Sequence, residues 1–230
     1  MEQDGERQAG GAVPGWDSRS IGADPGPAAL RAFIAIELPG SARTALASMV
    51  ASLPESSGRA VRWLRPGGIH LTLRFLGNIS EERVPELASS LAEAASRTAP
   101  FQLALGEPGG FPSVRAARVL WLGLTGELSR LRLLHSRLEG SLSNLGFPPE
   151  KRPFSPHLTL GRARPGARPY DLRRVGEELG RIPPWGAGGI ISVEFVTLFQ
   201  SHLGQSGATY EARALKPLGA PAESAHDGAE

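Results

Sequence analysis

The 230-residue sequence has no cysteine and only two lysines, Lys151 and Lys216. Without cysteine there are no disulfide bonds, thiolate nucleophiles or cysteine-ligated zinc and iron–sulfur sites. No apolar run approaches the ~20 residues that a membrane-spanning helix needs. The N-terminus also lacks the basic-then-apolar profile of a secretory signal. These absences predict a cytoplasmic protein with no membrane partner.

Basic side chains are concentrated in the middle of the chain. Residues 1–29 carry five acids and two bases, and residues 219–230 carry three acids and no base. Subtraction leaves 25 − 2 = 23 bases and 23 − 5 − 3 = 15 acids in residues 30–218, a net charge of +8. Most of these bases are arginine, whose planar guanidinium suits phosphate. A GC-rich coding sequence would favour arginine as well, so the charge is compatible with a nucleic-acid partner without identifying one.

The two ends of the chain differ from its middle. Residues 1–29 and 219–230 are rich in Gly, Pro, Ala and acids, which predicts disordered tails around one domain at 30–218. Within that domain we expect a long amphipathic helix over about 127–145 and a strand over 190–199 that begins a terminal hairpin. The order strand, helix, strand, helix occurs twice. It predicts an α+β fold of two lobes related by a pseudo-two-fold axis, with mainly antiparallel sheets.

One four-residue motif occurs twice in the sequence. Residues 70–73 and residues 157–160 both read His-Leu-Thr-Leu, and each copy follows turn-forming residues. Because side chains alternate along a strand, His70 and Thr72 point to one face and the two leucines to the other. The second copy has the same pattern. If the lobes are related by two-fold symmetry, the two motif strands face one another across a cleft and the two histidines meet.

Two imidazoles and two hydroxyls suit acid–base chemistry on a phosphodiester. Histidine gains or loses a proton near neutral pH, so one ring can act as the base and the other as the acid. The threonine hydroxyls can donate hydrogen bonds to phosphate oxygens. A zinc site is the competing interpretation, but threonine is a poor zinc ligand and no Asp, Glu or Cys lies near either motif in the sequence. A single copy would be read as an ordinary strand that contains a histidine; the duplication favours a functional site.

The sequence resembles the bacterial and archaeal RNA 2′,3′-cyclic phosphodiesterases, also called 2′-5′ RNA ligases, of the two-histidine (2H) phosphoesterase superfamily. The likeness runs from about residue 31 to 218 and includes both motifs. The segments that carry it are residues 31–39, 70–77, 118–123, 152–160 and 196–201, together with Tyr210.

The resemblance implies a fold, a reaction and roles for four residues. The fold is bilobal, with a cleft between two antiparallel sheets and helices on the outside, and the enzyme uses no metal. We also expect the protein to be a monomer without a cofactor. His70 is the proton donor, His157 is the proton acceptor, and Thr72 and Thr159 hold phosphate oxygens. Water attacks the cyclic phosphate at the 3′ end of an RNA or of a related nucleotide. The 3′-oxygen leaves, and the product is a 2′-phosphomonoester.

Three further residues are candidates for substrate contacts. Arg152 and Arg74 could bind phosphate or the RNA end, and the alternative for Arg74 is a carboxylate partner. Phe33 could stack on a terminal base or pack in the core. Arg162, which follows the second motif, could flank the cleft or be solvated. Two other functions stay open: reversible 2′-5′ ligation or hydrolysis of tRNA halves or small cyclic nucleotides, and a non-catalytic module that binds RNA ends.

Overall fold

The computed structural model describes residues 29–113, 116–182, 189–204 and 207–219. Apart from Ala29 and Gly219, the two segments predicted to be disordered tails lie outside these described residues. The helices are α1 (Gly40–Ser52), α2 (Ser56–Ala60), α3 (Val84–Ser96), α4 (Leu128–Asn144) and α5 (Pro169–Gly180), with short 3₁₀ turns η1 (Pro66–Gly68) and η2 (Glu81–Arg83). The strands are β1 (Ala29–Glu37), β2 (Val61–Trp63), β3 (His70–Ser80), β4 (Phe101–Phe111), β5 (Val119–Gly126), β6 (Leu158–Ala163), β7 (Ile190–Val193), β8 (Phe195–Gly204) and β9 (Gly207–Pro217).

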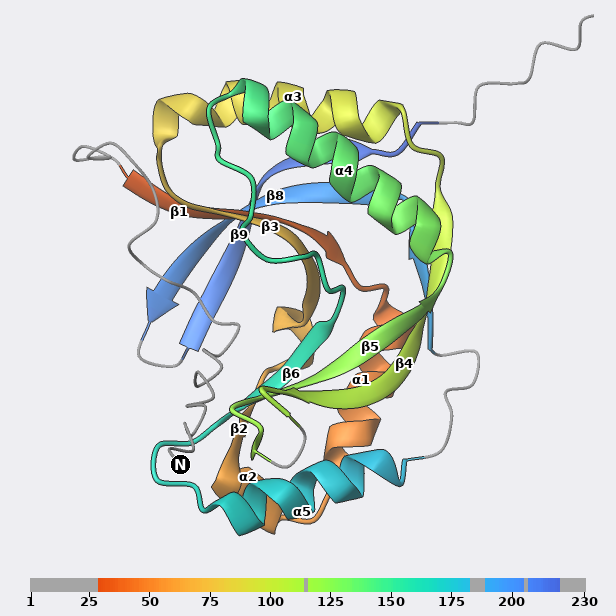
Figure 1. Cartoon of the computed structure of the whole chain (residues 1–230), viewed down its shortest axis with the longest axis vertical. Helices are drawn as coiled ribbons and strands as arrows, with labels where there is room; N and C mark the ends of the chain where they lie inside the picture. The colour runs from red at the N-terminus through yellow and green to blue at the C-terminus, as the bar shows by residue number, and fades with distance from the viewer. Residues whose placement is uncertain (1–28, 114–115, 183–188, 205–206, 220–230) are drawn as a thin grey trace, which may run out of the picture.

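The strands of the described ranges form a single curled sheet with two similar halves. The order is β7-β4-β5-β6-β3-β1-β8-β9, with β2 added beside β6. The two motif strands, β6 and β3, are therefore at the centre, with three further strands on either side. The centre is held by one antiparallel pair, Leu71 opposite Leu158. Figure 1 shows the halves diverging from this seam. The α+β class and the two-lobed form predicted from the sequence are confirmed, and the two sheets prove to be continuous through the seam.

Helices cover the outer side of each half (Figure 1). α3 and α4 lie together over the half that contains β8 and β9, and α1 and α5 pack on the half that contains β4 and β7. The predicted long helix is confirmed as α4. Its apolar stripe is buried because leucines three and four residues apart share one helix face. The buried positions are Leu131, Leu134, Leu138 and Leu142.

The prediction of a single strand over residues 190–199 is wrong in one respect. The chain forms two strands there, β7 and β8, with Glu194 between them. β7 pairs with β4 in one half, whereas β8 pairs with β1 in the other half and with β9. The break is required because the two strands belong to opposite halves of the sheet. The terminal hairpin itself, β8 with β9, is confirmed.

Each motif strand contains a β-bulge at the last leucine of the motif. In β3, Thr72 pairs with Ala35 and Arg74 with Ile34, so that Leu73 has no partner of its own. In β6 the same slip omits Leu160. A bulge places two residues opposite one and resets the alternation of side chains beyond it. The side chains that follow the motifs therefore do not point where simple alternation predicts.

Candidate active site

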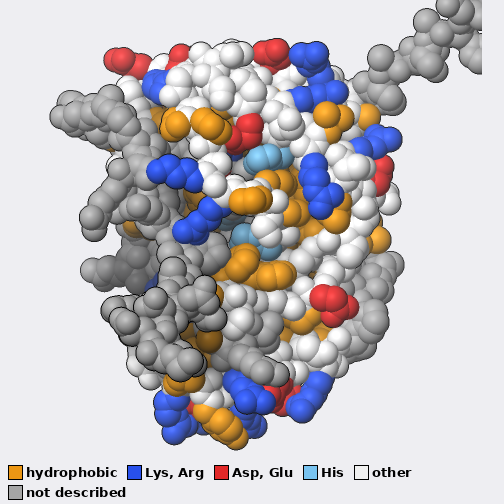
Figure 2. All heavy atoms as spheres, in the orientation of Figure 1, with side chains coloured by type: hydrophobic (Ala, Val, Ile, Leu, Met, Phe, Trp, Pro, Cys, Tyr) orange, Lys and Arg blue, Asp and Glu red, His pale blue; other side chains and the backbone are white. Residues whose placement is uncertain are grey.

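The seam of the sheet brings the two motifs together. Leu71 and Leu158, which are buried, face each other across it. Extending this antiparallel register by one residue in each direction sets the histidine of each motif opposite the threonine of the other. Both pairs of polar side chains then lie on the face opposite the central leucines. The structure thus brings together His70, Thr72, His157 and Thr159. In Figure 2, histidine side chains lie at the middle of the molecular face, next to hydrophobic side chains.

Both catalytic candidates are held by the same backbone contact. Nδ1 of His70 lies 3.0 Å from the carbonyl oxygen of Gly68, and Nδ1 of His157 lies 2.8 Å from that of Ser155. A carbonyl oxygen only accepts, so Nδ1 must carry the proton in each ring. In the neutral ring, Nε2 is then left as the basic nitrogen. Two imidazoles related by the pseudo-two-fold axis are thereby preset in the same tautomer.

Aromatic side chains surround His70. Its ring stacks on Phe33 with 4.8 Å between centroids, and Tyr210 meets it edge-on at 4.9 Å. Phe199 stacks behind Phe33 at 5.2 Å. These residues form a small apolar cluster on the motif face, separate from the main core. Of the two roles predicted for Phe33, the structure shows packing, and the surface that it packs against is His70.

His157 is supported by a second aromatic pair. The ring of Phe111 meets it edge-on at 5.1 Å, and Trp121 lies 6.0 Å away. Trp121 in turn lies against the backbone at Gly109, where a Cβ would come within 2.3 Å of the indole ring. Position 109 therefore requires glycine for this indole position. The two histidines thus have different neighbours despite their common backbone contact.

Burial changes the acidity of both imidazoles. Burial lowers the pKa of His70 from 6.5 to about 4, and the hydrogen bond to Gly68 opposes the shift only partly. Burial also lowers the pKa of His157; the bond to Ser155 opposes this, and the positive charge of Arg162 adds to it. Removing water from a cation disfavours it, so both rings are mainly neutral at pH 7.

Arg162 lies on the motif face beside the His157 half of the site. Its backbone pairs with Val119 of β5 and with Arg62 of β2. Burial lowers the pKa of His157 and raises the pKa of Tyr210, two groups in opposite halves; the charge of Arg162 adds to the first shift and opposes the second. The guanidinium is therefore near the seam. From the sequence, Arg162 was one of several arginines that could flank the cleft. Its orientation depends on the bulge at Leu160, which the residue pattern does not reveal.

Arg74 lies on the other side of the sheet. The bulge turns it toward α4, where it is 5% exposed. Its Nη1 lies 3.2 Å from Glu139 Oε2 and 3.7 Å from Glu150, and its Nη2 donates to the carbonyl of Pro148. Of the two roles left open for Arg74, the structure shows pairing with carboxylates. The side chain lies on the face opposite the motif histidines and does not reach the site. Arg152 is exposed near Glu150; burial raises the pKa of Glu150, and the charge of Arg152 opposes that shift.

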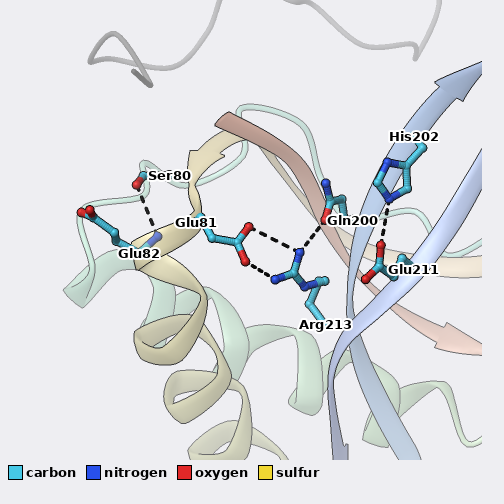
Figure 3. Close-up of polar contacts among 7 residues, drawn as sticks. All are labelled: Ser80, Glu81, Glu82, Gln200, His202, Glu211 and Arg213. Carbon is cyan, nitrogen blue, oxygen red and sulfur yellow. Dashed lines mark hydrogen bonds and ion pairs between the residues drawn. The ribbon is translucent and has the colours of Figure 1, made fainter. Parts of the chain in front are cut away.

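Polar side chains link the terminal hairpin to the 3₁₀ turn η2. Figure 3 shows Arg213 of β9 between Glu81 of η2 and Gln200 of β8, with Nη1 2.6 Å from the Gln200 amide oxygen. Further along the hairpin, Nε2 of His202 lies 3.0 Å from Glu211. The contact between Arg213 and Glu81 ties the hairpin to η2, and the hairpin supplies Phe199 and Tyr210 to the site.

Comparison with known proteins places this site in a family. The sequence pattern described as LigT like Phosphoesterase matches residues 36–121 and again residues 122–210. The chain belongs to the LigT-like phosphoesterase family. The two matches divide the chain between the two motifs, one motif in each match. Each half of the sheet nevertheless takes strands from both matches, since β8 of the second lies beside β1, which leads into the first, and β7 of the second lies beside β4 of the first.

Known proteins are similar to this LigT-like chain in sequence, and solved structures are similar to it in fold. An RNA 2′,3′-cyclic phosphodiesterase of Geobacillus stearothermophilus is 34% identical over 191 residues, which cover 82% of this chain and only 58% of that protein. One of Aeropyrum pernix is 32% identical over 155 residues, covering 67% of this chain and 85% of that protein. The structure of E. coli LigT complexed with 3′-AMP matches with a TM-score of 0.65 and 28% identity, over 83% of this chain and 98% of that one.

The described residues of the LigT-like fold contain neither a metal-binding cluster nor a membrane-spanning helix. Within those ranges, no group of three or more His, Asp or Glu side chains is arranged to hold a metal ion. None of the helices described has the length and apolar character needed to cross a membrane.

Proposed function

We propose that this chain hydrolyses RNA 2′,3′-cyclic phosphate ends to 2′-phosphomonoesters by acid–base catalysis without a metal. The observation that carries the proposal is the seam: two His-x-Thr motifs meet there, with both imidazoles held in one tautomer by backbone carbonyls. Membership of the LigT-like family supports it, as do relatives named RNA 2′,3′-cyclic phosphodiesterase. The substrate class, RNA ends or related nucleotides, rests on the same relatives.

In the proposed reaction, His157 accepts a proton from the water that attacks phosphorus. The bond to the 3′-oxygen breaks, and His70 donates a proton to that oxygen. The phosphate stays on the 2′-oxygen, and solvent returns the two histidines to their starting states. Thr72 and Thr159 donate hydrogen bonds to the non-bridging oxygens, on which charge increases in the transition state. Acid–base catalysis of this kind contributes roughly 10²–10⁴-fold.

The acid role requires His70 to be protonated, although burial holds its pKa near 4 in the free protein. A bound phosphodiester brings a negative charge to the seam, and a nearby anion favours the imidazolium. Substrate binding therefore raises the pKa of the group that must donate. Because the bound substrate causes this rise in pKa, His70 becomes charged only when the site is occupied and a proton must be donated.

The decisive experiment uses an RNA oligonucleotide that ends in a 2′,3′-cyclic phosphate, with excess EDTA present. We expect turnover to an RNA that ends in a 2′-phosphate. Mass spectrometry detects the added water, and resistance to an enzyme that removes only 3′-phosphates assigns the phosphate to the 2′ position. His70→Ala and His157→Ala should each lower kcat by 10²-fold or more. His202→Asn, which changes an exposed histidine of the hairpin, is the matched control and should keep the parent rate.

Several results would reject parts of the proposal. Loss of activity with EDTA contradicts metal-free catalysis, and a normal rate in either alanine variant contradicts the role assignment. Joining of RNA ends in place of hydrolysis would support the 2′-5′ ligase alternative. Binding of cyclic ends without any turnover would support the non-catalytic module. A monomeric state and a cytoplasmic location stay predictions from the sequence.

A further inference from the structure

One edge of β6 pairs with two strands in succession. The other edge is occupied by β5 over residues 158–162. The remaining edge pairs with β3 at Leu158 and, past the motif, with β2 at residues 161–163. β2 therefore continues the line of β3, on the side of the site that carries His70. A side chain of β2 that points to the motif face is next in line after this histidine.

Arg62 is that side chain. Its two neighbours in β2 point the other way, since a Cβ on Gly161 would come within 2.7 Å of Val61 and 2.9 Å of Trp63. Both neighbours pack with the main core. Alternation along the strand turns Arg62 to the motif face, where it is exposed. Its partner across the strands is Arg162. The two arginines start from Cβ atoms about 5 Å apart.

This arginine pair, Arg62 and Arg162, carries two like charges without compensation. Like charges directly opposite each other in a sheet are unfavourable. No carboxylate in the described part of the chain forms an ion pair with either guanidinium, whereas Arg168 holds Asp171. Basic side chains lie on the same molecular face as the histidines (Figure 2). Two exposed, unneutralised guanidinium groups on one face suit an anion, and their planar shape suits phosphate in particular.

The spacing of side chains along the strands indicates which phosphate this is. The antiparallel register sets His70 opposite Thr159 at the seam, and the arginine pair forms the next row on the same face. Rows on one face recur about every 7 Å, and the bulge in β6 lengthens this step to at most about 10 Å. The backbone of one nucleotide spans a step of this length. A cyclic phosphate at the seam therefore leaves the arginine pair within reach of the neighbouring phosphate.

We propose that Arg62 is a specificity residue that, together with Arg162, binds the phosphate on the 5′ side of the terminal nucleotide. The inference rests on the proposed function, since it assumes that a cyclic phosphate binds at the seam. The preferred substrate then carries two phosphates, one cyclic and one on the 5′ side of the same ribose. Every RNA longer than one nucleotide supplies both. A 2′,3′-cyclic nucleoside with a free 5′-hydroxyl leaves the arginine pair without an anion.

The test compares two substrates that differ only in the 5′ phosphate: 2′,3′-cyclic AMP and its 5′-phosphorylated form. The readout is the ratio of kcat/KM for the 5′-phosphorylated substrate to kcat/KM for the other. At 50 mM NaCl we expect a parent ratio of roughly 5- to 50-fold, since each hydrogen bond to a charged group is strong but this site is exposed. Arg62→Gln should lower the ratio roughly fourfold or more. Arg62→Lys should keep part of it, because it retains the charge without the planar fork.

Two further measurements accompany the ratio. Raising NaCl to 200 mM should lower the parent ratio roughly 2.5-fold, as expected for one phosphate contact, and should change the ratio of Arg62→Gln much less. Arg132→Gln is the matched control, because it removes an exposed arginine from the outer helix α4. It should keep both the parent ratio and the parent salt dependence.

The outcomes separate the two proposals. A parent protein that hydrolyses neither substrate nor cyclic-ended RNA contradicts the proposed function itself. Equal kcat/KM for the two substrates, or a parent ratio in Arg62→Gln, overturns the second phosphate site and leaves the proposed function intact. Thermal melting checks the physical basis, because removing one of two facing like charges should leave the melting temperature unchanged or raise it. A lower melting temperature for Arg62→Gln would contradict the repulsion on which the inference is built.

Discussion

At the scale of single residues, the environment of His70 links catalysis to stability. The ring is enclosed by Phe33 and Tyr210 and donates its Nδ1–H to Gly68. This enclosure fixes the tautomer and excludes water, and for the same reason it disfavours the charged form. In the proposed reaction, His70 must be charged during turnover, yet it lies where burial makes the charged form unfavourable in the free protein.

The pKa of His70 predicts a loss of stability in mild acid. Its pKa is about 4 in the folded protein and 6.5 as a reference for the unfolded chain, so the unfolded state binds the proton more readily. The stability from neutral His70 is complete above about pH 6.5 and is lost as the pH falls toward 4. Between pH 7.5 and 5.0 this amounts to about 2 kcal/mol. Urea denaturation at both pH values should show that the parent loses about this much more than His70→Gln. Equal losses in the two proteins would contradict the burial-induced shift.

At the scale of elements, Arg74 fastens the first motif strand to the segment that leads to the second. Its guanidinium contacts Glu139 of α4, and its partners Pro148 and Glu150 belong to the connection between α4 and β6. His135, also on α4, stacks at 4.0 Å on Phe154 of the same connection. The chain approaching His157 is thus packed against the strand that carries His70.

Arg74→Met should be clearly destabilising, because it leaves Glu139 half-enclosed without its cation. Loss of one partner of a buried pair costs about 3–5 kcal/mol, and the partial exposure of both carboxylates reduces the expected value to about 2–3 kcal/mol. Arg74→Met with Glu139→Met should recover part of that loss, as measured by urea denaturation. Arg173→Met, which removes an exposed pair with Glu177, is the control and should change stability by less than about 1 kcal/mol. A cost for Arg74→Met as small as for the control would contradict this function of the pair.

The bulges also explain what the sequence could and could not predict about the site. Alternation along a strand correctly placed His70 and Thr72 on one face and the leucine between them on the other. It fails after Leu73, where the bulge directs Arg74 to α4 and exposes Phe75. A bulge depends on how two strands pair, and pairing is a property of segments distant in the sequence. For this reason the residue pattern made Arg74 a candidate for substrate binding, although its side chain lies on the other side of the sheet.

At the scale of the whole molecule, duplication made the overall form predictable. A repeated motif within a repeated order of elements indicated two lobes with the motifs between them, and the seam at Leu71 and Leu158 agrees. The path of the C-terminal strands was less predictable. Residues 190–199 read as one apolar strand, yet the chain crosses between the halves at Glu194. Where the strand breaks depends on which edge of the sheet is still open for pairing. The local sequence carries no information about that edge.

The excess of arginine in residues 30–218 predicts a salt effect that grows with substrate length. Each phosphate contacted by a cation releases counterions on binding, so added salt weakens binding in proportion to the number of phosphates engaged. Raising NaCl from 50 to 200 mM should lower kcat/KM for a cyclic-ended RNA of about ten nucleotides several-fold more than for 2′,3′-cyclic AMP. Equal salt slopes for the two substrates would mean that only the terminal phosphate is contacted.

The position of β8 beside β1 determines when the site can be completed during synthesis. Ala35 pairs with Thr197, so 197 − 35 = 162 residues separate two neighbours in the sheet. Contacts this distant in sequence slow folding, because the loop must close before they form. The aromatic neighbours of His157 lie before it in the chain, whereas His70 awaits Phe199 and Tyr210. On the ribosome, we therefore expect the surroundings of the earlier histidine to assemble last, once the hairpin of β8 and β9 has emerged.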